Sequence, residues 1–197
     1  MDTAFTTARE IFDSGGPVMW PLLLLSLVAL TIAFERFIFW TGAHRRARLK
    51  ALASIRIRWA NADRELEPRL IQQAGPLYLP CVDALSRLGA RGEGEAIEAV
   101  RRRAERFGGT LSFIITGAPL LGILGTVLGI IQSFDALGST GDEVQLPVIA
   151  AGIAQALVTT AFGLIVALVA LVPYVIIRGN AQRALGEAEA LVSSIRG

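Results

Sequence analysis

The stretch Ala118–Phe134, APLLGILGTVLGIIQSF, lies inside an uncharged run of residues that begins at Gly108. As a helix, this run is long enough to cross a hydrocarbon core of ~30 Å. It also contains a GxxxG pattern, Gly125–Gly129, which lets two membrane helices approach closely. Small and hydroxylated residues recur at spacings of four, three and four, so they share one helical face. This face predicts either close helix packing or a narrow polar path, and its members are Gly122, Thr126, Gly129 and Ser133.

The composition indicates a membrane protein with several spans. Of 197 residues, 53% are hydrophobic, which is more than an ordinary soluble domain carries. One cysteine, Cys81, excludes an intramolecular disulfide, and one histidine, His44, argues against a conventional metal centre. Neither a phosphate-binding loop nor a GxGxxG pattern occurs. The sequence therefore predicts no cofactor, no metal site and, lacking a nucleophile–base pair, no enzyme.

Three hydrophobic segments predict three transmembrane helices, at residues 18–40, 110–134 and 147–177. In the first, Trp20 and Trp40 lie ~30 Å apart along a helix, which places one indole at each interface. Glu35 and Arg36 fall near its inner end, where adjacent opposite charges are expected to pair or to reach the membrane edge. We expect this charge pair to be structural.

The distribution of charge predicts the topology. Residues 41–109 carry fourteen of the nineteen Lys and Arg residues, which places this helical region in the cytoplasm. The loop 135–146 is acidic and has no basic residue, so it belongs outside together with residues 1–17. Arg178 and Arg183 return the chain to the cytoplasm, where residues 178–197 continue as a helix.

The polar middle region shows helical periodicity with two predicted breaks, one at Pro68 and one across Gly75–Pro80. Three glycines predict a turn within the second helical run: Gly89, Gly92 and Gly94. The basic run Arg101–Arg103 is compatible with nucleic acid, but its position just before the second span favours contact with anionic lipid.

The polar residues of the second and third spans are the candidates for function. Thr126 lies on the second span, and Gln155, Thr159 and Thr160 lie on the third. Hydroxyls and a carboxamide donate and accept hydrogen bonds, but they do not hold a proton near neutral pH. Because neither span contains Asp, Glu, His, Lys or Arg, a proton that crosses here needs a carrier from another chain. The alternative is that these groups only join helices, at about 0.6 kcal/mol per hydrogen bond.

Small residues of the third span repeat with helical spacing on two faces. Gly152, Gln155 and Thr159 share one face, and Ala156, Thr160 and Gly163 share another. The glycines of the two spans are predicted to pack helices together, and they are Gly122, Gly125, Gly129, Gly152 and Gly163.

Three segments together resemble the ExbB/TolQ/MotA proton-channel family, and its ExbB-like branch most closely. The segment Gly15–Ser26, GGPVMWPLLLLS, followed by Glu35-Arg36, is similar to the first span of that family. The segment Ala118–Gly129, with Phe134 behind it, matches the signature of the second span almost letter for letter. The segment Ile153–Leu164, IAQALVTTAFGL, matches the third, and the region between spans one and two is much less diagnostic.

The resemblance implies a multi-pass protein of the bacterial inner membrane, with a periplasmic N-terminus and a cytoplasmic C-terminus. It implies a homopentamer around a single-span ExbD/TolR-like partner that supplies a membrane aspartate, working with a TonB/TolA-like protein. Thr126 and Thr160 would then be the pore-lining threonines near that aspartate. Gln155 stands where relatives carry glutamate, which leaves open whether this chain handles protons differently there.

We therefore predict an all-α membrane protein that acts as the proton-channel subunit of a motor for envelope transport. The alternative is a non-conducting membrane scaffold that uses the same helices only to hold a single-span partner.

Overall fold

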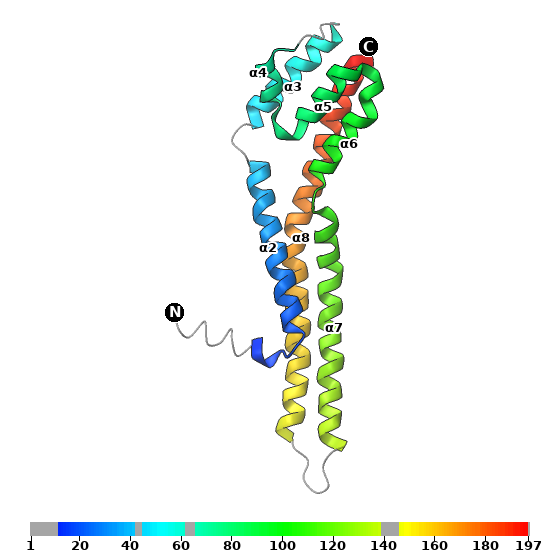
Figure 1. Cartoon of the computed structure of the whole chain (residues 1–197). Helices are drawn as coiled ribbons and strands as arrows, with labels where there is room; N and C mark the ends of the chain where they lie inside the picture. Colours follow the sequence, from blue (N-terminus) through cyan, green and yellow to red (C-terminus); the bar gives the residue numbers. More distant parts are fainter. Residues whose placement is uncertain (1–11, 42–44, 62–65, 139–145, 197) are drawn as a thin grey trace, which may run out of the picture. The chain divides into compact units, whose positions relative to one another are not determined.

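The computed structural model describes residues 12–41, 45–61, 66–138 and 146–196, and within these ranges it contains helices and no strand. Three of the described helices are long and apolar enough to span a membrane: α2 (Met19–Thr41), α7 (Gly108–Gly138) and α8 (Leu146–Arg196). The predicted all-α membrane fold with three spanning helices is thus confirmed (Figure 1).

The chain divides into two compact units. The first, here called the apolar unit, contains residues 1–34 and 109–174. The second, here called the polar unit, contains residues 35–108 and 175–197. Helices α2 and α8 each contribute to both units, and α8 runs without a break past Arg178.

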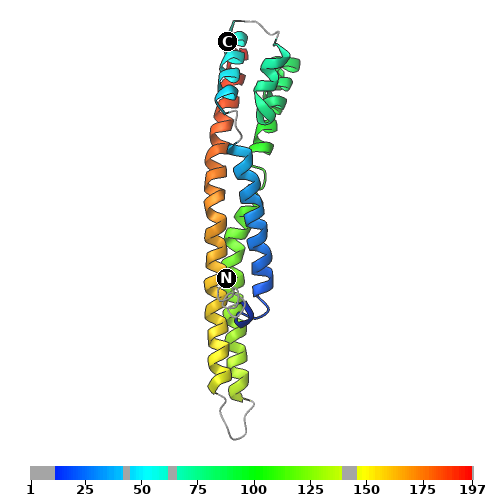
Figure 2. The ribbon, with the colours of Figure 1, turned by 90° about the vertical axis from the view of Figure 1, so that its left-hand side faces the viewer.

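In the apolar unit, α7 and α8 lie side by side and antiparallel (Figures 1 and 2). The buried residues of each helix follow a spacing of three and four, which defines one stripe along the helix. On α7 they are Leu111, Ile114, Ala118, Gly122, Gly125, Gly129 and Ser133. On α8 they are Gly152, Ala156, Thr159, Gly163, Val166 and Ala170. Large apolar side chains such as Leu120 and Leu157 are exposed on other faces, as expected where lipid is the solvent.

The polar unit contains four shorter α-helices and one 3₁₀ turn among its described residues. They are α3 (Arg45–Ala60), α4 (Pro68–Gln73), α5 (Gly75–Leu88), η1 (Gly89–Gly92) and α6 (Glu93–Ala104). Its core combines residues of α3, α5, α6 and the C-terminal part of α8. The most completely buried large side chains of this core include Ile55, Leu77, Tyr78, Leu85 and Leu191.

Two of the predicted boundaries are confirmed, and the third is confirmed only in part. Helix α4 begins at Pro68, and the predicted turn is the 3₁₀ segment Gly89–Gly92. A break lies at the start of the predicted segment Gly75–Pro80, because α4 ends at Gln73 and Gly75 has φ +79°, but α5 then continues through Pro80.

A side chain from another helix explains why Pro80 is tolerated inside α5. Proline has no N–H, so the carbonyl of Pro76, four residues earlier, lacks its normal helical donor. Arg103 Nη1 of α6 donates a hydrogen bond to this carbonyl. The guanidinium thus satisfies an acceptor that the helix leaves open, which local sequence patterns did not reveal.

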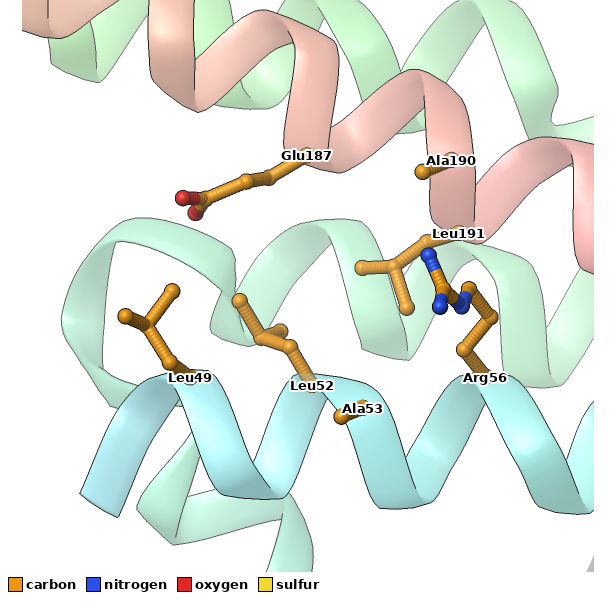
Figure 3. Close-up of a pocket in the computed structure, with 7 residues that line it drawn as sticks. All are labelled: Leu49, Leu52, Ala53, Arg56, Glu187, Ala190 and Leu191. Atoms are coloured by element: carbon orange, nitrogen blue, oxygen red, sulfur yellow. The ribbon is translucent and has the colours of Figure 1, made fainter. Parts of the chain in front are cut away.

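A shallow groove of about 160 Å³ runs between α3 and the C-terminal part of α8. Figure 3 shows Glu187 extending toward the Leu49 end and Arg56 lying next to Leu191. The Tyr78 hydroxyl donates a hydrogen bond to Glu187 Oε2. Burial raises the pKa of the Tyr78 phenol above its ordinary value, so it stays a neutral donor at neutral pH.

The thiol of Cys81 is predicted to be unreactive in the folded protein. Cys81 on α5 is completely buried, and burial raises the pKa of its thiol to about 12. Because the thiolate is the nucleophile, the raised pKa lowers the reactive fraction at pH 8 by roughly 1,000-fold. In detergent micelles at pH 8, a maleimide should label Cys81 only after denaturant is added, and rapid labelling of the folded chain would contradict the burial.

Candidate functional site

The glycines of α7 and α8 bring the two helix backbones into direct contact. A Cβ atom built on Gly129 would lie 2.5 Å from the Gly152 carbonyl oxygen. A Cβ atom on Gly163 would lie 2.6 Å from the Ala118 carbonyl oxygen. These distances are far below van der Waals contact, so a side chain at either position would push the helices apart. We call this contact, which runs from Ala118 to Ser133 on α7 and from Ile149 to Gly163 on α8, the glycine seam.

Two hydroxyl groups form hydrogen bonds across the glycine seam. Thr160 Oγ1 of α8 donates to the Gly122 carbonyl oxygen of α7 at 3.2 Å. In the opposite direction, Ser133 Oγ of α7 is 3.1 Å from the Ile149 carbonyl oxygen of α8 and 3.0 Å from the Gly129 carbonyl oxygen. Hydrogen bonds between helices therefore join the pair at both ends of the seam.

Thr159 and Thr126 lie in different environments. Thr159 is fully buried, and its hydroxyl is 3.0 Å from each of the carbonyl oxygens of Gln155 and Ala156. Its side chain fills the space in front of Gly125, where an added Cβ would collide with the hydroxyl. Thr126 is partly exposed on α7, and its hydroxyl donates to the Ile123 carbonyl oxygen at 2.6 Å.

The carboxamide of Gln155 lies against the turn that precedes α2. A Cβ atom on Gly16 would collide with Gln155 Nε2, and Gly16 has φ +67°, a conformation that favours glycine. Gln155 Nε2 is buried and forms no hydrogen bond within the described residues. A buried N–H donor without a partner is costly, so this amide is available to a group that could approach it.

The apolar unit also contains a groove, and its lining is apolar. Between α2 and α7 lies a groove of about 580 Å³, lined by Pro21, Leu24, Leu25, Phe113, Gly117, Leu120, Leu121 and Leu124. None of the polar candidates lines it, so it offers no hydrogen-bonding path.

Glu35 and Arg36 meet in the polar unit. Arg36 Nε lies 2.9 Å from Glu35 Oε2, and only 3% of the Arg36 side chain is exposed. The guanidinium also donates to the Arg103 carbonyl oxygen at 3.0 Å and lies over the rings of Phe39 and Phe107. The buried charge thus has an acid, a carbonyl and two aromatic faces around it, and the structural role of the pair stays a prediction.

A model of a known protein family matches the part of the chain that contains the glycine seam. The model of the MotA/TolQ/ExbB proton channel family matches residues 92–190, which include α7 and most of α8. This chain belongs to that family. The resemblance stated from the sequence is therefore confirmed, and the chain is a membrane protein of a channel family.

Relatives within the family come from several organisms. The chain is 36% identical over 175 residues to a Synechocystis protein called ExbB-like 1, covering 83% of this chain and 67% of the relative. It is 31% identical over 186 residues to the Tol-Pal system protein TolQ of Pseudomonas aeruginosa, covering 82% and 79% of the two chains. It is 39% identical over 99 residues to the biopolymer transport protein ExbB of Salmonella typhimurium, covering 49% and 40%.

The structure brings most of the residues predicted for the site to one seam. Gly122, Gly125, Gly129, Gly152 and Gly163 all have close contacts across it. Thr159 and Thr160 border the seam from neighbouring faces of α8, whereas Thr126 bonds only to its own helix. Sequence reasoning missed the hydrogen bond from Ser133 to the Ile149 carbonyl oxygen and the contact of Gly16 with Gln155. One partner is a backbone carbonyl and the other a glycine, and neither has a side chain that signals the contact.

The glycine seam predicts a strong difference between two glycines of α7. Gly129→Ala should destabilise the helix pair by about 1–3 kcal/mol, because the added methyl would meet the Gly152 backbone. Gly117→Ala is the matched control, because its Cβ has nothing nearer than Phe113 Cζ of the same helix at 3.7 Å. Unfolding by denaturant in micelles, followed by circular dichroism, measures both, and equal stabilities of the two variants would refute the seam.

Proposed function

We propose that this chain is the proton-conducting subunit of an inner-membrane complex that converts proton-motive force into work for envelope transport. The observation that carries this proposal is the chemistry of the α7–α8 pair. It presents hydroxyls and a carboxamide, but no Asp, Glu, His, Lys or Arg from Gly108 to Phe134 or from Val144 to Ile177. Membership of the proton channel family supports the same function.

The hydrogen bonds of the threonines determine what they can offer to a proton carrier. The hydroxyls of Thr126 and Thr160 both donate to backbone carbonyls. Their oxygen lone pairs remain as acceptors, so each can receive a hydrogen bond from a protonated carboxyl group. These two hydroxyls therefore stabilise the neutral form of a passing acid, which is the form that carries the proton.

Gln155 offers the complementary group. Its buried Nε2 has no hydrogen bond within the part of the chain that the structure describes. When the side chain turns away from Gly16, this amide can donate to an ionised carboxylate, which Thr126 and Thr160 do not do. Thr159 contributes to the packing of the glycine seam. Its hydroxyl is fully buried and donates to carbonyl oxygens of α8 itself.

The carrier itself comes from a second protein. We propose a single-span partner of the ExbD/TolR type that supplies a membrane aspartate and is surrounded by a pentamer of this chain. Each proton that moves down the membrane potential then yields about 2.3 kcal/mol per 100 mV for mechanical work. A TonB/TolA-like protein would receive that work.

The proposed topology follows from charge. The polar unit, with its many arginines, lies in the cytoplasm together with the C-terminus, and the N-terminus lies in the periplasm.

The double variant Thr126→Val plus Thr160→Val tests the conducting role. Valine keeps the shape and removes the acceptor oxygens, so proton flux into liposomes that contain this chain and its partner should fall by about tenfold or more. Loss of the Thr160–Gly122 hydrogen bond costs only about 0.6 kcal/mol, so assembly should persist.

The control is Thr126→Ser plus Thr160→Ser, which restores both hydroxyls and should restore flux. If the valine variant assembles normally and conducts like the natural chain, the conducting role is wrong and the chain is a scaffold for its partner.

Gln155→Met separates packing from proton handling. Because Nε2 has no bond to lose, the stability of the variant should be unchanged or higher. Proton flux in the same liposomes should fall, since the donor for an ionised carboxylate is gone. A variant with lower stability and unchanged flux would assign Gln155 to packing alone.

A further inference from the structure

Four arginines crowd the end of α6, and the structure gives them different roles. Arg103 is engaged, because its guanidinium donates to the Pro76 carbonyl oxygen. Arg101, Arg102 and Arg106 are exposed, and none of the three has an ion pair among the described residues. The only acid within this segment is Glu105, so residues 101–106 carry a net charge of three positive units.

The chain itself keeps this cluster close to the membrane. Helix α7, a candidate span, begins at Gly108, two residues after Arg106. The turn between α6 and α7 is tight: Glu105 N–H donates to the Arg101 carbonyl oxygen and Gly108 N–H to the Glu105 carbonyl oxygen. Arg101 and Arg102 are therefore only six or seven residues before the start of a spanning helix, within reach of the headgroup layer.

An aromatic ring accompanies the cluster. The Arg106 guanidinium lies 4.6 Å from the centroid of the half-buried Phe107 ring. An arginine on an aromatic ring next to a membrane span is typical of the interface between hydrocarbon and headgroups. This arrangement favours a lipid over a nucleic acid, which would need no neighbouring span.

We propose that Arg101, Arg102 and Arg106 form a binding surface for the headgroups of anionic phospholipids, whereas Arg103 serves the structure of α5. Guanidinium groups pair with phosphate oxygens through two parallel hydrogen bonds, and each basic residue near an anionic surface strengthens association by about fivefold. Three of them together give a preference of roughly 100-fold for anionic over zwitterionic lipid.

The test uses the full-length chain in detergent, titrated with phosphatidylglycerol or phosphatidylcholine and followed by native mass spectrometry of the lipid-bound protein. The variant is Arg101→Gln, Arg102→Gln and Arg106→Gln together. Its affinity for phosphatidylglycerol should fall by roughly 100-fold, while its affinity for phosphatidylcholine should not change. The corresponding triple lysine variant should keep the preference, because it keeps the charge.

The matched control removes the same charge elsewhere in the polar unit. Arg69→Gln, Arg87→Gln and Arg91→Gln together change three exposed arginines of α4, α5 and η1. This control should bind phosphatidylglycerol like the natural chain, and an equal loss in both variants would overturn the proposal in favour of a general charge effect.

Two further outcomes would also overturn it. One is undiminished phosphatidylglycerol binding by the glutamine variant of the cluster. The other is tight binding of a single-stranded uridine oligonucleotide that this variant loses while its lipid binding persists. Arg103→Gln serves as the structural reference: it should lower the melting temperature and leave the lipid preference intact, because its guanidinium is committed to Pro76.

Discussion

The contact between the backbones of α7 and α8 is the constraint on which the apolar unit depends. Helices that lie in lipid gain little from burying apolar side chains, because the lipid tails are equally apolar. Close backbone approach and hydrogen bonds between helices must therefore supply the association. Glycines at Gly129, Gly152 and Gly163 provide that approach, since each would place a Cβ atom against backbone of the other helix. The hydroxyls of Ser133 and Thr160 add the hydrogen bonds.

The same constraint determines what the polar groups can do. A hydroxyl in a membrane span must donate its proton to some acceptor, and here each described threonine of the seam region uses a backbone carbonyl. The result is a set of acceptor oxygens and one amide donor, without any group that titrates. Such a surface suits a visiting carboxyl group better than a chain of water molecules alone, which is why the proposed function requires a partner.

In the polar unit, the arginines have different contacts and therefore different roles. Its arginines are not interchangeable, because Arg36 is buried among an acid, a carbonyl and two rings, and Arg103 caps the carbonyl exposed by Pro80. The arginines that remain exposed at the end of α6, in contrast, are free to meet an external anion. The arginines at the end of α6 look alike in the sequence. The fold gives Arg103 a structural contact and leaves Arg101, Arg102 and Arg106 exposed for binding.

The sequence by itself determined the number of spans, the all-helical fold and the family, because hydropathy, charge and the glycine spacings are local properties that need no tertiary information. It also identified the small residues of the seam. Only the tertiary structure decided that Thr159 is buried behind Gly125 while Thr126 stays at the edge, because the register of two antiparallel helices is set by their mutual contact. It likewise decided that Pro80 remains inside α5 and that Gln155 rests on Gly16. In both cases the stabilising or contacting group lies far away in the chain, where no local pattern can reveal it.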